Sequence, residues 1–293
     1  MRNMFSEYLS IFRRNLPYVV RRDASVLSLF SQDSCRFLEK RGEDGGLSAL
    51  LCYHENVILL LCVDAPFRNQ GWGSELLALA EEEIRACGYS DVRLGAGVGY
   101  LMPGVPTHFP AFFSSTEEIV LPEWEDFSSF FKKRGYRHAW DCNCFDMAKA
   151  LLPEDASIGD ASISLVIPDD KAAILGMMED AHPSFTRHYQ KDALYQEGND
   201  SRVIAFCAEN KPLGALIVTL GADDVGTIGC VAVLHAFRGQ GVAMRLVRYA
   251  TGYLARRGAN FAFVGYTYSG MERLYGKCGY QIRSYYLMGK KDL

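Results

Sequence analysis

The sequence predicts an α/β fold of two tandem units, each with a central mixed sheet flanked by helices. Two observations carry this prediction. The segment FRNQGWGSEL at 67–76 returns 170 residues later as FRGQGVAMRL at 237–246. Around each copy, strand-like and helix-like patterns follow one another in the same order. The repeat therefore indicates an internal duplication of one α/β unit.

The boundary between the units lies near the middle of the chain. Residues 150–165 are rich in Pro, Gly, Ser and Asp, which favours a linker. The interval of 170 residues also separates Gly95 from Gly265, so the register holds beyond the glycine-rich turns. We expect a degenerate N-terminal domain at 1–149 and a C-terminal domain at 160–293.

In the first unit, an amphipathic helix comes first, because Phe5, Tyr8, Leu9 and Phe12 recur at helical spacing. This pattern is not the unbroken apolar core of a signal peptide. Further elements are expected as two strands within 47–63, a helix from Leu76 to Gly88, a strand over 91–99, a helix over 127–135 and a strand over 136–145. Residues 100–124 form an insertion without a counterpart in the second unit.

The second unit repeats this order. Strands are expected over 162–167, 201–210, 213–220, 226–233, 261–268 and 280–289, and helices over 171–180, from the glycine-rich turn to about Gly258, and over 271–279.

Composition excludes several classes of function. The chain has 293 residues, 49% of them hydrophobic, and a net charge of −4. A strongly basic domain is usual for nucleic-acid binding, so we expect no such partner. Apolar runs such as Val57–Val63 have strand length, far below the roughly 20 residues of a membrane span. We therefore expect a cytoplasmic protein that does not bind a membrane. The sequence leaves the oligomeric state open.

The cysteines predict reduced thiols rather than a metal centre. Nine is an odd number, and they are scattered. The nearest approach to a cluster is His138, Cys142 and Cys144, whereas a zinc site normally has four ligands in paired spacings. We favour structural cysteines over zinc and expect no metal.

The repeated turn is suited to binding an anion. Glycine lets the backbone approach a ligand closely, and the first N–H groups of the following helix point outward together. Arg238 and Arg68 could add charge-assisted bonds to phosphate oxygens. The alternative is that the glycines only close a tight turn. A P-loop is excluded because neither copy has the Gly-Lys-(Ser/Thr) sequence. The run GAGVG at 95–99 does not open a helix, which argues against a dinucleotide fingerprint.

Taken together, the turns and their surroundings resemble the GNAT family of acetyl-CoA-dependent N-acetyltransferases. The resemblance rests on VAVLHAFRGQGVAMRLVRYA at 231–250 with ERLYGKCGY at 272–280, and on VDAPFRNQGWGSELLALAEEE at 63–83 with FFKKRGY at 130–136. It implies that acetyl-CoA is the co-substrate. It further implies contacts to the cofactor from the backbone of Cys230, Val231, Val233, Arg238, Gly239, Gln240, Gly241, Val242 and Ala243.

The resemblance also implies that the halves differ. Tyr275 matches the tyrosine that commonly protonates the departing thiolate in this family, although a core tyrosine would show the same pattern. Phe131 stands at that place in the first half, and it has no proton to give. The first turn is therefore only a possible second cofactor site. Its residues are Arg68, Asn69, Gln70, Gly71, Trp72 and Gly73.

Two features of the implied site stay open. Many family members carry a glutamate on the strand before the turn, where this chain has Gly229 and Cys230. The general base could instead be Asp223, Asp224, His182 or a water chain, or the amine could arrive neutral and need no base. A possible acceptor pocket comprises His182, Phe185, Tyr266 and Tyr268. Such an aromatic wall suits a sugar, although a packed helix connection would use the same residues.

The leading interpretation is an acyltransferase that moves an acetyl group from acetyl-CoA to the primary amine of a small molecule. The amine attacks directly in a ternary complex, and an amino sugar is the first candidate for the acceptor. The alternatives are an acyl-CoA-binding regulatory module without turnover and a protein or peptide N-acetyltransferase.

Overall fold

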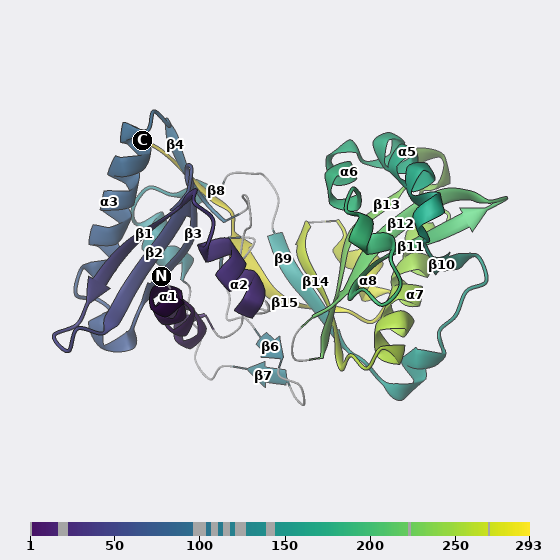
Figure 1. Cartoon of the computed structure of the whole chain (residues 1–293), viewed down its shortest axis with the longest axis horizontal. Coiled ribbons are helices and arrows are strands. Elements are labelled where there is room, and N and C mark those ends of the chain that lie inside the picture. The colour runs from purple at the N-terminus through teal and green to yellow at the C-terminus, as the bar shows by residue number, and fades with distance from the viewer. Residues whose placement is uncertain are drawn as a thin grey trace. The chain divides into compact units, whose positions relative to one another are not determined.

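A computed structural model describes residues 2–16, 23–95, 104–106, 111–113, 118–120, 127–138, 144–221, 224–268 and 270–293. The chain divides into two units (Figure 1). Unit 1 comprises Met1–Phe112, Ile119–Phe145 and Ser284–Leu293, and unit 2 comprises Phe113–Glu118 and Asp146–Arg283. Each unit is a mixed sheet with helices on its faces, as the sequence predicts. The domain boundaries 1–149 and 160–293 remain a proposal about the duplicated sequence.

Unit 1 is built on a six-stranded sheet in the order β1-β2-β3-β4-β16-β8. Its strands are β1 (Cys35–Arg41), β2 (Leu47–His54), β3 (Val57–Val63), β4 (Asp91–Leu94), β16 (Gly289–Asp292) and β8 (Arg137–His138). Neighbours are antiparallel except β3 and β4, which are parallel.

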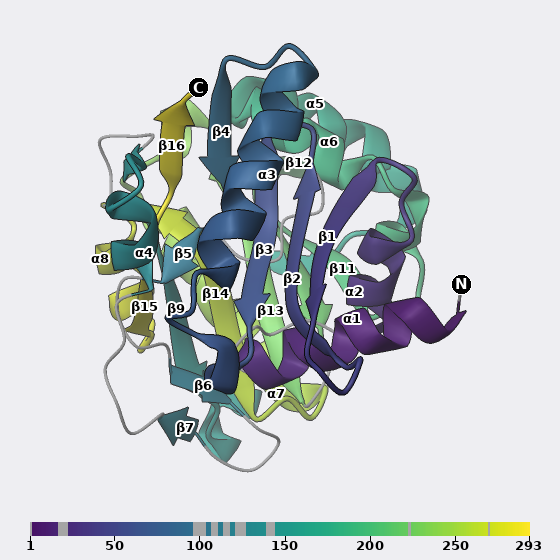
Figure 2. The ribbon, with the colours of Figure 1, turned by 90° about the vertical axis from the view of Figure 1, so that its left-hand side faces the viewer.

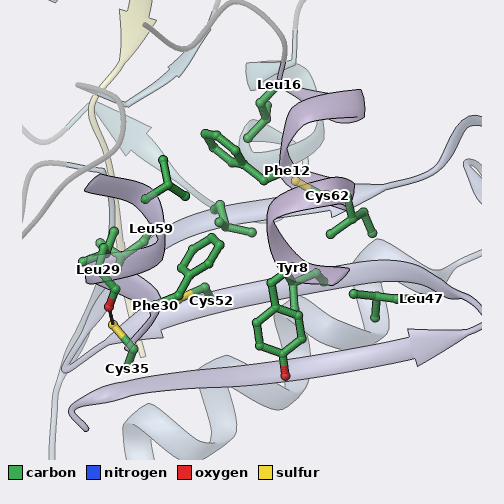
Figure 3. Close-up of a cluster of buried hydrophobic side chains, with 14 of the residues drawn as sticks. Tyr8, Phe12, Leu16, Leu29, Phe30, Cys35, Leu47, Cys52, Leu59 and Cys62 are labelled. Atoms are coloured by element: carbon green, nitrogen blue, oxygen red, sulfur yellow. Dashed lines mark hydrogen bonds between the residues drawn. The ribbon is translucent and has the colours of Figure 1, made fainter. Parts of the chain in front are cut away.

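Helices cover both faces of this sheet. On one face lie α1 (Arg2–Asn15) and α2 (Asp23–Phe30), with Tyr8, Phe12 and Phe30 packed against β-strand residues such as Cys52 and Leu59 (Figure 3). On the other face lies α3 (Trp72–Ala86), seen in front of the strands in Figure 2. It buries Leu76, Leu77, Ala80 and Ile84, the four residues that predicted this helix.

Unit 2 has a longer sheet, in the order β10-β11-β12-β13-β14-β9-β15. Its strands are β10 (Ile163–Leu165), β11 (Ser201–Ala208), β12 (Lys211–Leu220), β13 (Val225–Val233), β14 (Phe261–Tyr268), β9 (Cys144–Ala150) and β15 (Gln281–Leu287). From β10 to β13 the pairing is antiparallel, whereas β13 and β14 are parallel. The last residues of β15 belong to unit 1 and pair there with β5 (Val105–Pro106).

Four α-helices belong to unit 2: α5 (Lys171–Ala181), α6 (Pro183–Tyr189), α7 (Val242–Arg256) and α8 (Glu272–Gly276). The first two share a core with β11–β13 through Ile174, Met178 and Tyr189. On the opposite face, α7 packs closely because β12 and β13 offer glycines. A Cβ on Gly214 would lie 3.2 Å from the Leu246 side chain, and one on Gly226 would collide with the side chain of Leu254.

The remaining described elements are short. They are α4 (Ser128–Lys132), the strand pair β6 (Ala111–Phe113) and β7 (Glu118–Val120), and the 3-10 turns η1 (Ala65–Phe67), η2 (Pro153–Ser157), η3 (Pro168–Asp170), η4 (Asp192–Tyr195) and η5 (His235–Phe237). Most of the insertion expected at 100–124, and residues 96–99 of the strand expected before it, lie outside the described residues. No helix in the described ranges combines the length and apolarity needed to cross a bilayer.

Two sequence predictions about strands were wrong. The strand expected over 136–145 is two strands, because β8 ends the sheet of unit 1 while β9 joins the sheet of unit 2 between β14 and β15. Residues 139–143 lie outside the described part. Likewise, the strand expected over 280–289 ends at Leu287, and β16 follows in the sheet of unit 1. Each sheet is thus completed by a strand from the other half of the sequence.

Candidate active site

The glycine-rich turn between β13 and α7 presents backbone N–H groups that the helix itself cannot pair. Gly239 and Gly241 have φ of 77° and 82°, and the first bond of the helical ladder runs from the N–H of Arg245 to the carbonyl of Gly241 at 3.0 Å. The N–H groups of Val242 and Ala243 precede that bond, so they have no acceptor in the helix. A Cβ on either glycine would meet no described atom within 4 Å. The turn therefore presents backbone donors and the positive end of a helix dipole to open space.

Side chains of the turn hold it in place. Nε of Arg238 donates to the carbonyl of Val233 at 3.0 Å, and Nη2 donates to the carbonyl of Ala181 at 2.9 Å. Gln240 donates to the carbonyl of Ala236 at 3.0 Å. The Arg238 guanidinium thus braces the turn against β13 and α5.

The first copy of the turn has the same conformation. Asn69 and Gly71 have φ of 61° and 89°. Arg68 donates from Nε to the carbonyl of Val63 at 2.9 Å, and Gln70 donates to the carbonyl of Pro66 at 2.7 Å. These bonds match those of Arg238 and Gln240 position by position. Asn fits where the second copy has Gly239, because asparagine tolerates the left-handed region.

The surroundings of the two turns differ in charge and bulk. Trp72 stacks on Phe67 with ring centroids 4.4 Å apart, where the second copy has the smaller Val242. Oε1 of Glu75 lies 3.6 Å from the position of a Cβ on Gly71. At the place of Glu75 the second copy has Arg245, which binds Asp160 with two bonds of 2.7 Å. The Glu75 carboxylate, paired with Lys40, thus stands beside the first turn, and the Arg245 guanidinium, paired with Asp160, stands at the equivalent place beside the second.

Above the second turn, β13 and β14 diverge. They pair only from Val225 to Thr227 on β13 and from Phe261 to Phe263 on β14. Beyond these pairs, β13 carries an extra residue relative to β12 between the pairs of Ala215 and Ile217, which is a β-bulge. The residues Cys230, Val231 and Val233, which the sequence assigns to cofactor binding, follow the point of divergence.

Tyr275 lies on α8, buried at 4% exposure. Burial raises its pKa to about 12, although a hydrogen bond with the Thr267 side chain acts in the opposite direction. The thiols of Cys278 and, to a smaller extent, Cys230 raise the pKa further. Tyr275 therefore stays protonated throughout the physiological range, so it can give up a proton but cannot act as a general base.

The counterpart of Tyr275 in unit 1 keeps the packing and lacks the hydroxyl. The Tyr275 ring meets Tyr280 edge-on at 6.1 Å, and the Phe131 ring meets Tyr136 edge-on at 5.6 Å. Both Phe131 and Tyr275 are buried. The two small helices are thus equivalent as packing units and different in chemistry.

The expected acceptor residues form two aromatic pairs. His182 stacks on Phe185 with ring centroids 3.9 Å apart, at the connection between α5 and α6. Tyr266 meets Tyr268 edge-on at 5.2 Å on β14. Within each pair the structure brings the predicted residues together. The two pairs stand on separate elements.

The position of Asp224 argues against it as the general base. Asp224 precedes β13 at the end where the strand is paired with β14, since its carbonyl accepts from the N–H of Asn260 at 2.8 Å. This is the end opposite the turn, so Asp224 does not face the divergence. Asp223 lies outside the described residues. In the described part of the chain, no three His, Cys, Asp or Glu side chains are grouped to hold a metal ion, and Cys142 of the considered cluster lies outside it.

Sequence reasoning missed two buried polar residues at the divergence. Oη of Tyr189 on α6 donates to the carbonyl of Cys230 at 2.7 Å. Oδ1 of Asp146 on β9 accepts from the backbone N–H of Tyr266 at 2.9 Å. Neither residue stands in a motif, and their partners lie 41 and 120 residues away in the sequence.

A separate polar cavity of about 630 Å³ opens in unit 1 beside Arg68. Arg14 and Asp64 line it and form a two-bond ion pair of 2.8 and 2.7 Å, and Asn15 adds a third bond to Asp64. Burial raises the pKa of Asp64, but these hydrogen bonds outweigh it and keep that pKa below its ordinary value. Within this cavity Arg14 and Asp64 thus satisfy each other. Tyr275 belongs to the other unit.

Comparison with known proteins identifies the family. Residues 172–280 match the model of the acetyltransferase (GNAT) family. No curated protein matches the sequence. Three similar solved structures are a GCN5-related glucosamine N-acetyltransferase region in a fungal multi-domain GH3 β-N-acetylglucosaminidase, a tandem GNAT protein from the clavulanic acid biosynthesis pathway and a GCN5-related N-acetyltransferase from Sphaerobacter thermophilus.

These likenesses extend over nearly the whole chain. The fungal region has a TM-score of 0.74 and 18% identity, and covers 99% of this chain but only 37% of that longer protein. The tandem GNAT protein has a TM-score of 0.69 and 14% identity, with 99% and 95% covered. The Sphaerobacter enzyme has a TM-score of 0.62 and 17% identity, with 92% and 85% covered. At these identities the likeness establishes the fold. Residues 172–280 are therefore an acetyltransferase domain of the GNAT family, and the chain as a whole has the fold of a tandem GNAT protein.

Proposed function

We propose that unit 2 transfers an acetyl group from acetyl-CoA to the primary amine of a small molecule. The observation that carries the proposal is the divergence of β13 from β14 above a turn whose first backbone donors have no acceptor in the helix. The gap would hold the thioester along Cys230, Val231 and Val233. The pyrophosphate would bind to the N–H groups from Arg238 to Ala243, at the N-terminus of α7, where an anion is most favoured.

In this reaction the amine nitrogen attacks the thioester carbonyl carbon directly. The C–S bond then breaks, and Tyr275 gives its Oη proton to the departing sulfur while the amine loses a proton to water. A phenol with a pKa of about 12 is a weaker acid than a free thiol at about 8.5. The same buried surroundings that raise the pKa of Tyr275 also destabilise the thiolate, which brings the two pKa values closer.

An amino sugar is the first candidate acceptor. The paired rings of His182 and Phe185 and of Tyr266 and Tyr268 supply flat apolar faces with polar edges, which suit a ring that is apolar on its faces and polar at its rim. The fungal structure of similar fold contains a glucosamine N-acetyltransferase region, which supports the same class.

Release of free thiol from acetyl-CoA tests the proposal. Purified protein would be assayed against amino sugars, aminoglycosides, polyamines, amino acids and short peptides. We expect amino sugars to be acetylated, and we expect Tyr275→Phe to lose about 10²-fold or more in kcat, the range of general acid catalysis. Turnover of peptides alone would instead establish a peptide N-acetyltransferase.

A matched control keeps the test specific. Tyr280 is also buried in unit 2, and its hydroxyl bonds the Thr251 hydroxyl at 2.8 Å. Tyr280→Phe removes a buried hydroxyl without removing the proposed acid, so its kcat should stay within about twofold of wild type. Equal losses in the two variants would exclude the acid role of Tyr275. Binding of acetyl-CoA without turnover of any amine would favour a regulatory module, an outcome consistent with Gly229 and Cys230 standing where many relatives have a glutamate.

A further inference from the structure

Two residues with strained backbone stand at equivalent places on the diverging strands. Cys230 on β13 has φ of 51°, and Tyr266 on β14 has φ of 59°. Each lies three positions beyond the last paired residue of its strand, since the pairs end at Thr227 and Phe263. Left-handed conformation is uncommon for residues other than glycine and persists only when surrounding groups enforce it.

On β13 the enforcing group is Tyr189. Its Oη donates to the carbonyl of Cys230 at 2.7 Å, and its side chain is fully buried. Burial raises the pKa of Tyr189 well above its ordinary value, so the hydroxyl remains a donor at any physiological pH. Tyr195 in turn donates to the backbone carbonyl of Tyr189 at 2.9 Å and fixes the end of α6.

On β14 the enforcing group is Asp146. Its Oδ1 accepts from the backbone N–H of Tyr266 at 2.9 Å, and the residue is 6% exposed. Asp146 lies on β9, the neighbour of β14 in the sheet of unit 2. In the sequence it precedes the boundary between the duplicated units, so the first half of the chain supplies it.

The two contacts have a common consequence. In a regular parallel pair, one of two directly opposite residues bonds to the partner strand and the other bonds to the strand on its far side. Here the Cys230 carbonyl and the Tyr266 N–H are each occupied by a buried side chain. The regular ladder cannot extend through these two residues unless the side-chain bonds break, and a buried polar group without its partner is costly.

We propose that Tyr189 and Asp146 are positioning residues that hold β13 and β14 apart, so that the gap for acetyl-CoA exists before the cofactor binds. This inference rests on the proposed cofactor site, and it goes beyond it by assigning the cause of the gap to two side chains that do not touch the reacting atoms. We call the two contacts the strand latches.

The direct test measures binding of CoA by calorimetry, with no amine present. Tyr189→Phe and Asp146→Ala should each weaken binding about 10-fold, because part of the binding free energy must then reopen the gap. Asp146→Asn keeps an acceptor oxygen for the Tyr266 N–H, so it should bind within about twofold of wild type. Tyr280→Phe, which loses a comparable buried bond elsewhere in unit 2, should also bind normally.

A rescue experiment separates positioning from general destabilisation. Glycine adopts positive φ without strain, so a chain with Cys230→Gly should need Tyr189 less. In that background Tyr189→Phe should weaken CoA binding by no more than about threefold. If Tyr189→Phe costs as much affinity with Cys230→Gly as without it, the proposed role of Tyr189 is wrong. Normal binding of CoA by the Tyr189→Phe variant would also contradict that role. Should Asp146→Ala fail to fold, this cycle decides the question alone.

The outcomes distinguish this inference from the proposed function. If the variants change CoA binding as expected but the protein acetylates no amine, the strand latches are supported and the proposed acetyl transfer is wrong. For a chain that binds no CoA, the same cycle of Tyr189→Phe and Cys230→Gly is measured by urea unfolding. A loss of stability from Tyr189→Phe that is smaller in the Cys230→Gly background would still support the latch on β13, and additive losses would reject it.

Discussion

At the scale of single residues, the decisive difference between the halves is one hydroxyl group. Tyr275 and Phe131 are both buried on short helices, and each packs edge-on against a tyrosine five positions later. The packing requirement is thus met by either ring. The hydroxyl of Tyr275 is therefore the group to test for chemistry.

The raised pKa of Tyr275 gives a prediction for the pH profile. Burial stabilises the neutral phenol and raises its pKa to about 12, so the acid form is lost only as pH rises through that value. We expect kcat at saturating acceptor to rise as the amine deprotonates and then to stay level through about pH 10. A phenol with an ordinary pKa near 10 would lose half its acid form there. A falling limb with its midpoint below about pH 10, in protein shown by circular dichroism to remain folded, would contradict the assignment.

At the scale of elements, one local structure occurs twice with different electrostatics. The two turns share left-handed residues and two side-chain bonds that brace the backbone. Their sequences predicted this conformation, because glycine or asparagine is favoured at positive φ. The helix N-terminus attracts anions, but the Glu75 carboxylate already lies at the start of α3 and competes for that place. Of the two turns, the one before α7 is the better site for a pyrophosphate.

This contrast predicts one cofactor per chain. Calorimetric titration with acetyl-CoA should give a stoichiometry of one. Gly241→Ala strains a residue with φ of 82° and places a methyl group in front of the donors, so it should weaken binding about 10-fold or more. Gly71→Ala imposes the same strain in unit 1 and should leave the affinity within about twofold. Two equivalents bound by wild type, or equal effects of the two substitutions, would show that unit 1 also binds the cofactor.

The sequence predicted the elements whose apolar residues recur at a regular spacing. It did not predict the strands and contacts that depend on pairing between distant parts of the chain. The helices α3, α5 and α7 and the strands β11–β14 appear where apolar spacing placed them. The edge strand β1 was missed because a single one of its residues is buried, so CRFLEKR shows no apolar alternation. Tyr189 and Asp146 were missed because their partners are backbone groups far along the chain. Backbone groups carry no signal in a sequence.

At the scale of the whole molecule, the two halves of the sequence are not the two units of the structure. Alternation continues across residues 136–145, and nothing in that pattern marks the place where the chain leaves one sheet for another. As a result β9 brings Asp146 into the sheet of unit 2, and β16 completes the sheet of unit 1. The placement of β9 and β16 makes each unit depend on residues from the other half of the sequence, even though only one half carries Tyr275.

The exchanged C-terminal strand gives a prediction at this scale. β16 pairs with both β4 and β8 in unit 1, and Lys291 binds Glu81 of α3 at 2.6 Å. A chain without residues 289–293 loses these ladder bonds and exposes the edge of β4. By hydrogen exchange, we expect the amides of Val92 and Leu94, which face β16, to lose protection. The amide of Arg93, which donates to the Asn56 carbonyl, and those of β12 in unit 2 should keep theirs.

The control for this truncation keeps the strand and removes only charges. Arg137 pairs with Asp292 at 2.6 Å, and Lys290 pairs with Asp91 at 3.0 Å, both near the surface. The Arg137–Asp292 pair is exposed and contributes little to stability because solvent screens it, and Asp91 keeps its bond from Asn56 when Lys290 is removed. Lys290→Ala with Asp292→Ala should therefore leave the protection of β4 nearly unchanged. If the double variant exposes β4 as strongly as the truncation, side-chain charge and not strand pairing holds β16 in place. If the truncated chain keeps β4 protected, the sheet of unit 1 does not need the strand that the second half supplies.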